Sequence, residues 1–161
     1  MCYDDGVDAP RFIADKTVGR LAKWLRLLGF DCALQREDDI ERLFEQARRE
    51  ARIILTKSTK LPAGVNAPAR LLLTSSDSMV QLRQVIGEFH LPIDDNRMLT
   101  ICLVCNVPVE SITREQARGL VPPYVFATQE TFSRCPSCGR IYWAGTHKAR
   151  MSRRLQSLGQ K

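Results

Sequence analysis

Apolar positions along the first hundred residues alternate between short continuous runs and helical spacing. The runs favour buried strands at residues 11–14, 30–34, 52–56 and 70–74. Apolar residues three or four positions apart predict helices over residues 17–28, from Asp38 or Asp39 to about Glu50, and through residues 80–89. Gly29 stands where a glycine commonly ends a helix. This order of elements predicts an α/β fold with a mostly parallel sheet and right-handed crossovers, and residues 91–99 as the connection to the last third of the chain.

Two Cys-x-x-Cys pairs dominate the last third of the chain. Cys102 and Cys105 form the first pair, Cys135 and Cys138 the second, and 29 residues separate the pairs. Four thiolates can surround a zinc ion tetrahedrally, and a two-residue gap lets one tight turn present two sulfurs. Gly139 suits the strained backbone after the last ligand. We therefore predict a structural zinc site, with two disulfides or a redox pair as alternatives.

The remaining two cysteines lack such partners. We interpret Cys2 and Cys32 as ordinary reduced thiols, with Cys32 buried in a strand. The residues Met1–Pro10 are acidic and polar, unlike a signal peptide, and no apolar run approaches the roughly 18 residues of a membrane span. These features predict a cytoplasmic protein without a membrane partner, in a compartment that keeps thiols reduced.

The net charge of +6 is distributed unevenly. Residues 1–101 hold 15 Lys and Arg against 15 Asp and Glu, whereas residues 102–161 hold nine against three. A nucleic-acid surface needs cations for phosphates and planar groups for bases, and the basic third interleaves both. The candidate residues there are Arg140, Trp143, His147, Lys148 and Arg150. A solvated basic tail or a surface for acidic proteins is the alternative.

Acidic residues follow the predicted strands. Asp15 ends the first strand, Asp38 and Asp39 follow the second, and Asp77 follows the fourth. The carboxyl ends of parallel strands meet at one crevice, where such side chains would form a site for magnesium or manganese. Two ions of this kind can activate water for phosphodiester cleavage. Helix capping is the alternative for each of the last three aspartates.

The first predicted helix has a basic face that begins beside Asp15. On a helical wheel, Lys16, Arg20, Lys23 and Arg26 lie opposite the apolar side. We expect this face to be exposed and to guide a substrate phosphate toward the acidic residues, with Lys16, Arg20 and Lys23 contacting nucleic acid.

Three motifs resemble the Mut-seven C-terminal ribonuclease domain family. They are residues 15–31 (DKTVGRLAKWLRLLGFD), residues 52–57 (RIILTK) and residues 135–147 (CPSCGRIYWAGTH), and the likeness spans about residues 11–155. The resemblance implies a PIN-like three-layer parallel-sheet domain over residues 1–95. It also implies a small four-cysteine zinc ribbon with a basic tail over residues 96–161. RNA is the implied substrate, with acidic metal-binding residues at Asp15 and near Asp38 and Asp39.

One departure from the family pattern affects the predicted activity. The family commonly has Asp after the third strand, in a Leu-Thr-Arg-Asp type sequence, where this chain has Leu55-Thr-Lys-Ser58. Ser58 offers a neutral oxygen, and the loss of one carboxylate weakens metal binding. Two hypotheses remain: a metal-dependent ribonuclease, or an RNA-binding or ribosome-associated adaptor that keeps the fold without turnover.

Overall fold

The chain builds one parallel sheet in its first half. The computed structural model describes residues 9–157, except the side chains of residues 146 and 147. Strands β1 (Arg11–Ala14), β2 (Cys32–Leu34), β3 (Arg52–Thr56) and β4 (Arg70–Leu72) lie in the order β2-β1-β3-β4, and all neighbours are parallel. Each strand falls within a predicted range. The α/β fold class with a parallel sheet is confirmed.

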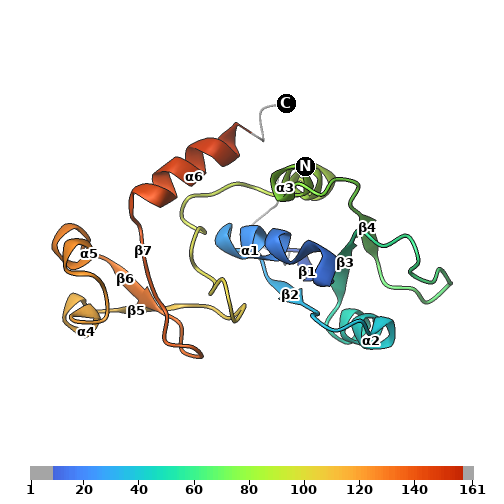
Figure 1. Ribbon diagram of the computed structural model, residues 1–161, viewed down its shortest axis with the longest axis horizontal. Coiled ribbons are helices and arrows are strands. Elements are labelled where there is room, and N and C mark those ends of the chain that lie inside the picture. The colour runs from blue at the N-terminus through green and yellow to red at the C-terminus, as the bar shows by residue number, and fades with distance from the viewer. Residues whose placement is uncertain (1–8, 158–161) are drawn as a thin grey trace.

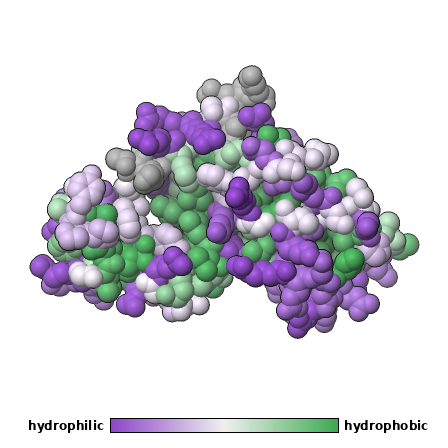
Figure 2. All heavy atoms as spheres, viewed as in Figure 1, coloured by the Kyte–Doolittle hydropathy of each residue, from purple (hydrophilic) through white to green (hydrophobic). Residues whose placement is uncertain are grey.

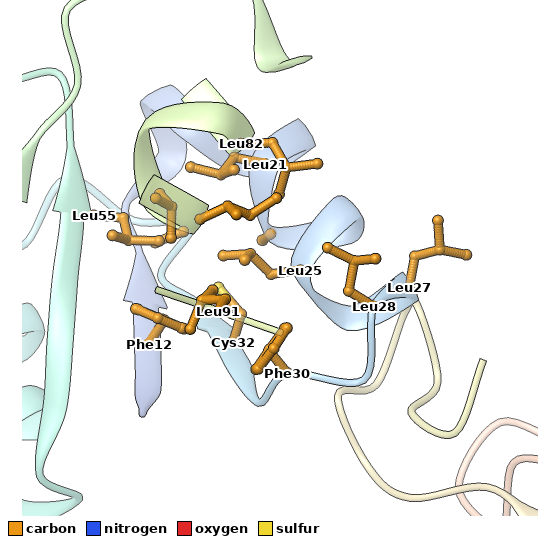
Figure 3. Close-up of a cluster of buried hydrophobic side chains, with 14 of the residues drawn as sticks. Phe12, Leu21, Leu25, Leu27, Leu28, Phe30, Cys32, Leu55, Leu82 and Leu91 are labelled. Atoms are coloured by element: carbon orange, nitrogen blue, oxygen red, sulfur yellow. The ribbon is translucent and has the colours of Figure 1, made fainter. Parts of the chain in front are cut away.

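Alternating side chains of β1 divide the sheet into two buried faces. Phe12 and Ala14 pack with helices α1 (Gly19–Leu27) and α3 (Ser78–Phe89) in the larger core, part of which Figure 3 shows. Ile13 points to the other face and packs against α2 (Ile40–Arg49). The sheet is therefore the middle of three layers, with α1 and α3 on one face and α2 on the other (Figure 1).

The cysteine-rich part forms a separate small sheet, which we call the ribbon (residues 101–143). Its strands β5 (Glu110–Ile112), β6 (Phe132–Arg134) and β7 (Ile141–Trp143) are antiparallel in the order β5-β6-β7. Two short helices, α4 (Arg114–Ala117) and α5 (Pro123–Thr128), lie between β5 and β6 at the far end of the molecule (Figure 1). Only Ala117, Val121 and Phe132 form its buried apolar cluster.

The part that contains the parallel sheet (residues 9–90, which we call the α/β part) and the ribbon are joined by more than the connecting chain. The Leu99 N–H donates to the Leu27 carbonyl over 2.9 Å. Gly29, which has the positive φ of 83° expected after a helix, also lets the connection approach: a Cβ there would lie 2.3 Å from the Arg97 carbonyl oxygen. The segment predicted as a basic tail includes helix α6 (Thr146–Gln156), whose Leu155 is fully buried in the core of the α/β part.

Hydrophobic and hydrophilic side chains gather on different parts of the surface. In the view of Figure 2, hydrophobic atoms show in the middle of the molecule and also on the ribbon at the left and at the right edge, and hydrophilic atoms gather at the top and the lower right. Among the described residues, no helix combines the length and the apolar composition that a membrane span needs.

The prediction of an exposed basic face on the first helix is wrong at Arg26. This side chain is only 4% exposed. Its guanidinium donates to the Cys32 carbonyl of β2 over 2.8 Å, and to the Leu103 and Val104 carbonyls of the ribbon over 2.9 and 3.0 Å. Arg26 therefore fastens the ribbon to the α/β part. Burial lowers the pKa of this guanidinium.

Candidate functional site

The four predicted ligands of a metal ion converge at one point. The Sγ atoms of Cys102, Cys105, Cys135 and Cys138 all lie within 4.8 Å of one another, and those of Cys102 and Cys138 are 3.7 Å apart. Tetrahedral zinc with Zn–S bonds of about 2.3 Å would hold sulfurs about 3.8 Å apart. The arrangement fits a bound metal ion and is compatible with a zinc ribbon.

Both cysteine pairs adopt the same local geometry. The N–H of the second cysteine approaches the Sγ of the first, at 3.4 Å for Cys105 and 3.5 Å for Cys138. The residue after each pair has a positive φ, 59° at Asn106 and 75° at Gly139. The sequence indicated the turn at Gly139. The matching turn at Asn106 was missed, although Asn is the non-glycine residue that most readily adopts this conformation.

Tyr142 supports the first cysteine pair. Its Oη lies 3.2 Å from Cys102 Sγ and accepts a hydrogen bond from the Leu103 N–H over 3.1 Å. Burial alone would raise the pKa of the Cys102 thiol, but hydrogen bonds from Tyr142 and from the backbone N–H groups of Cys105 and Val104 lower it to about 6. This environment stabilises the thiolate, which is the form that binds metal.

Cys32 behaves differently from these ligands. It is fully buried in β2, as predicted, and burial raises the pKa of its thiol to about 12. A thiol of this kind packs as a small apolar side chain. Cys2 lies outside the described residues.

Asp15 lies at the carboxyl end of β1, beside the end of β3. The chain runs from β1 to β2 on one side and then to β3 on the other, so the β1–β3 boundary is the point where the strand order reverses. Ligands of parallel sheets bind at this point. One Asp15 carboxylate oxygen accepts a hydrogen bond from the Thr17 N–H over 2.9 Å, and the other accepts one from the Thr56 hydroxyl. Thr56 Oγ1 in turn accepts from the Ser58 N–H.

The other three predicted acidic residues do not join Asp15 in a compact cluster. Asp38 forms an ion pair with Lys16, and its side chain is 81% exposed. Asp39 caps α2 through the Arg42 N–H. Asp77 caps α3, and the backbone N–H groups of the first turn lower the pKa of its carboxyl. Among the side chains that the structure describes, the four cysteines are the only group of three or more Cys, His, Asp or Glu that meet closely enough to hold a metal ion.

Three of the predicted nucleic-acid residues meet in a groove between α1 and the ribbon. Lys23, Arg140 and Trp143 line this groove, whose volume is about 450 Å³. Lys148 lines a smaller pocket of about 270 Å³ that also includes Trp143. Arg20 and Arg150 are exposed, on α1 and α6. The side chain of His147 lies outside the described residues.

Among curated proteins and solved structures, none matches the chain. The family model described as the Mut7-C RNAse domain matches residues 10–155, which include the parallel sheet, all four clustered cysteines and most of α6. The chain therefore belongs to the Mut7-C RNAse domain family.

Proposed function

We propose that this protein binds RNA and is a divalent-metal-dependent ribonuclease whose central metal-binding residue is Asp15. The observation that carries the proposal is the position of Asp15 at the β1–β3 boundary, in a chain of an RNase domain family. A carboxylate at this boundary faces the place where parallel sheets bind their ligands.

The oxygen donors at the carboxyl ends of β1 and β3, which we call the edge at Asp15, fit one hard metal ion better than two. Asp15 supplies the charge, and the hydroxyls of Thr17 and Thr56, which both contact its carboxylate, supply neutral oxygens. Magnesium is commonly held by one or two protein carboxylates together with substrate phosphates. The donor set thus suits an ion that binds together with RNA, which would act as a Lewis acid and lower the pKa of a bound water. Asp38, Asp39 and Asp77 would have to leave their present partners to add charge.

Basic side chains in α1 and just before it give RNA a route to Asp15. Lys16 directly follows Asp15, in the short turn before α1, and Arg20 lies in the first turn of α1. Lys23 lies one turn further along α1, where it lines the groove with the ribbon. A phosphodiester chain along α1 would meet cations from the ribbon to Asp15. The exposed arginines of α6 extend the positive surface and would strengthen binding through phosphate contacts that do not depend on sequence.

For the four cysteines we propose zinc in a structural role. Four protein thiolates leave no open position for substrate, which is typical of structural rather than catalytic zinc. A cytoplasmic location agrees with this ligand set, because a reducing compartment keeps the thiolates available.

The test is cleavage of labelled mixed-sequence RNA in the presence of manganese. Asp15→Asn should remove the cleavage. Asp94→Asn is the matched control: that carboxylate also accepts a hydrogen bond from the N–H two residues later, in Asn96, but it lies in the connection and does not follow a strand of the parallel sheet. Cleavage that is unchanged in Asp15→Asn, with melting temperature and zinc content as in the wild type, contradicts the proposed site.

A second candidate function is an RNA-binding or ribosome-associated adaptor without turnover. Two observations favour it: Ser58 stands where the family commonly has an acidic residue, and Asp38 is neutralised by Lys16. An adaptor would bind the labelled RNA and leave it intact in manganese. In that case Ser58→Asp, which adds a carboxylate next to Thr56, should raise cleavage above the wild-type level.

A further inference from the structure

We propose that the groove between α1 and the ribbon holds an unpaired base of single-stranded RNA, stacked on Trp143, with Lys23 and Arg140 on the flanking phosphates. This inference rests on the proposed function and adds to it the form of RNA that is bound and the residues that recognise it. It is carried by the size, the charge and the aromatic content of the groove.

The size and the walls of the groove suit a planar apolar group. Its volume of about 450 Å³ falls in the range of roughly 300–1,000 Å³ found for small-molecule pockets. Val104 and Leu120 line it and are 44% and 55% exposed. Pro122 and Leu103 add further apolar surface. A base inserted here would cover apolar atoms that water now contacts.

The charge of the groove selects a polyanion. Lys23 comes from α1, and Arg140 lies in the ribbon two residues after Cys138, so the two cations come from different parts of the molecule. None of the described residues that line the groove is acidic, and neither cation forms an ion pair with any of the described residues. The larger cavity beside α2, of about 650 Å³, is lined by Glu41, Glu45 and one cation, Arg48, so its charged lining is negative overall and suits phosphate less well.

Trp143 provides a fixed stacking surface. It is partly buried and packs against the small ribbon cluster around Phe132, while it also lines the groove. The neighbouring Tyr142 is fixed by its hydrogen bonds to Cys102 and Leu103. An aromatic side chain held in this way can stack on the exposed face of an unpaired base, whereas a duplex keeps its bases stacked on one another.

The test measures the affinity of zinc-loaded full-length protein, carrying Asp15→Asn to prevent cleavage, for a fluorescent single-stranded oligouridine and for a duplex of equal length. Trp143→Leu should weaken binding of the single strand about tenfold, and Trp143→Phe should restore most of it. Lys23→Gln with Arg140→Gln should reduce the slope of log affinity against log salt by about 1.4. The control pair, Arg48→Gln with Arg83→Gln, removes the same charge from exposed positions outside the groove.

The outcomes separate this inference from the proposed function. Unchanged affinity in Trp143→Leu, equal binding of duplex and single strand, or equal effects of the two double variants would overturn the groove inference. Cleavage that depends on Asp15 would still support the ribonuclease. If the groove variants weaken RNA binding but the wild-type protein, which keeps Asp15, cuts no RNA, the groove inference stands and the catalytic proposal fails. Absence of RNA binding by the wild-type protein overturns both.

Discussion

The α/β part and the ribbon differ in the interactions that stabilise each of them. Among the described residues, eighteen buried residues form the main core of the α/β part, whereas three form the apolar cluster of the ribbon. The ribbon therefore gains less stability from apolar burial. We expect it to depend on a metal ion at its four cysteines, which lie close enough together to hold one.

The ribbon is also stabilised by contacts with the α/β part, so the two parts are not independent. Arg26 of α1 donates to the carbonyls of Leu103 and Val104, which lie between the first two cysteines. Asn106, next to Cys105, accepts from the Cys32 N–H of β2 and donates to Asp31. The first cysteine pair is thus bound both by the proposed zinc and by the edge of the parallel sheet. Loss of the metal ion should therefore loosen the contacts with β2, and loss of those contacts should weaken metal binding.

Removal of zinc should give the largest difference in stability between the ribbon and the α/β part. Zinc binding contributes about 10–16 kcal/mol in small zinc peptides, so chelation should unfold the ribbon. We expect about one zinc per chain by metal analysis, and loss of amide protection over residues 101–143 by hydrogen exchange. Because Arg26 and Asn106 lose their partners, protection at β2 should also fall, while β1 and β3 stay protected.

Two results would change this picture. A ribbon that keeps its amide protection without metal would show that zinc is not its source of stability. Protection that is unchanged at β2 after chelation would show that the two parts fold independently. Refolding after zinc is added back is the control for damage by the chelator.

Replacement of Arg26 by Met should have the next largest effect. The substitution keeps the aliphatic stem but leaves the three carbonyl oxygens of Cys32, Leu103 and Val104 without their charged donor. We expect a loss of about 3 kcal/mol in the free energy of unfolding by urea, and weaker zinc binding in competition with a chelator.

Arg20→Met on the same helix is the matched control, because Arg20 is exposed. Its free energy of unfolding should stay within about 0.5 kcal/mol of the wild type. If Arg26→Met lowers stability but leaves zinc affinity unchanged, Arg26 stabilises the α/β part alone.

The elements of the α/β part were predictable because their signals are local. Residues 53–55 form a continuous apolar run at the centre of β3, and the helices repeat apolar residues over two or more turns. Helices α4 and α5, with four and six residues, are too short to show such a period, and the sequence did not indicate them. The four cysteines were predictable because their spacing carries the ligand geometry.

The wrong prediction that Arg26 is exposed and the untested role of the aspartates in metal binding have a common cause. A helical wheel gives the side of α1 on which Arg26 lies, but not that a loop 77 residues away covers it. Likewise, an aspartate before a helix is favoured both as a cap and as a metal ligand. Asp39 and Asp77 are caps in this structure, and their part in catalysis stays a prediction. Only long-range contacts separate these alternatives.

The smallest expected effect concerns Asp31, which links both parts at their boundary. Burial alone would raise the pKa of this carboxyl, but hydrogen bonds from Arg52, Asn106 and Arg11 outweigh it and lower the pKa below its ordinary value. A lowered pKa in the folded state means that Asp31 stabilises the fold above about pH 4, and that this contribution is lost as the pH falls through the lowered value. Glu50 shares Arg52 and contributes in the same direction.

Asp31→Asn should therefore lower the free energy of unfolding by about 1 kcal/mol at pH 7, since the partly exposed pair is screened by solvent. Urea unfolding at several pH values should show the difference from the wild type shrinking between about pH 5 and pH 3. Glu45→Gln, an exposed change on α2, is the control and should show no such trend. A difference that stays constant with pH would mean that Asp31 acts by packing and hydrogen bonding rather than through its charge.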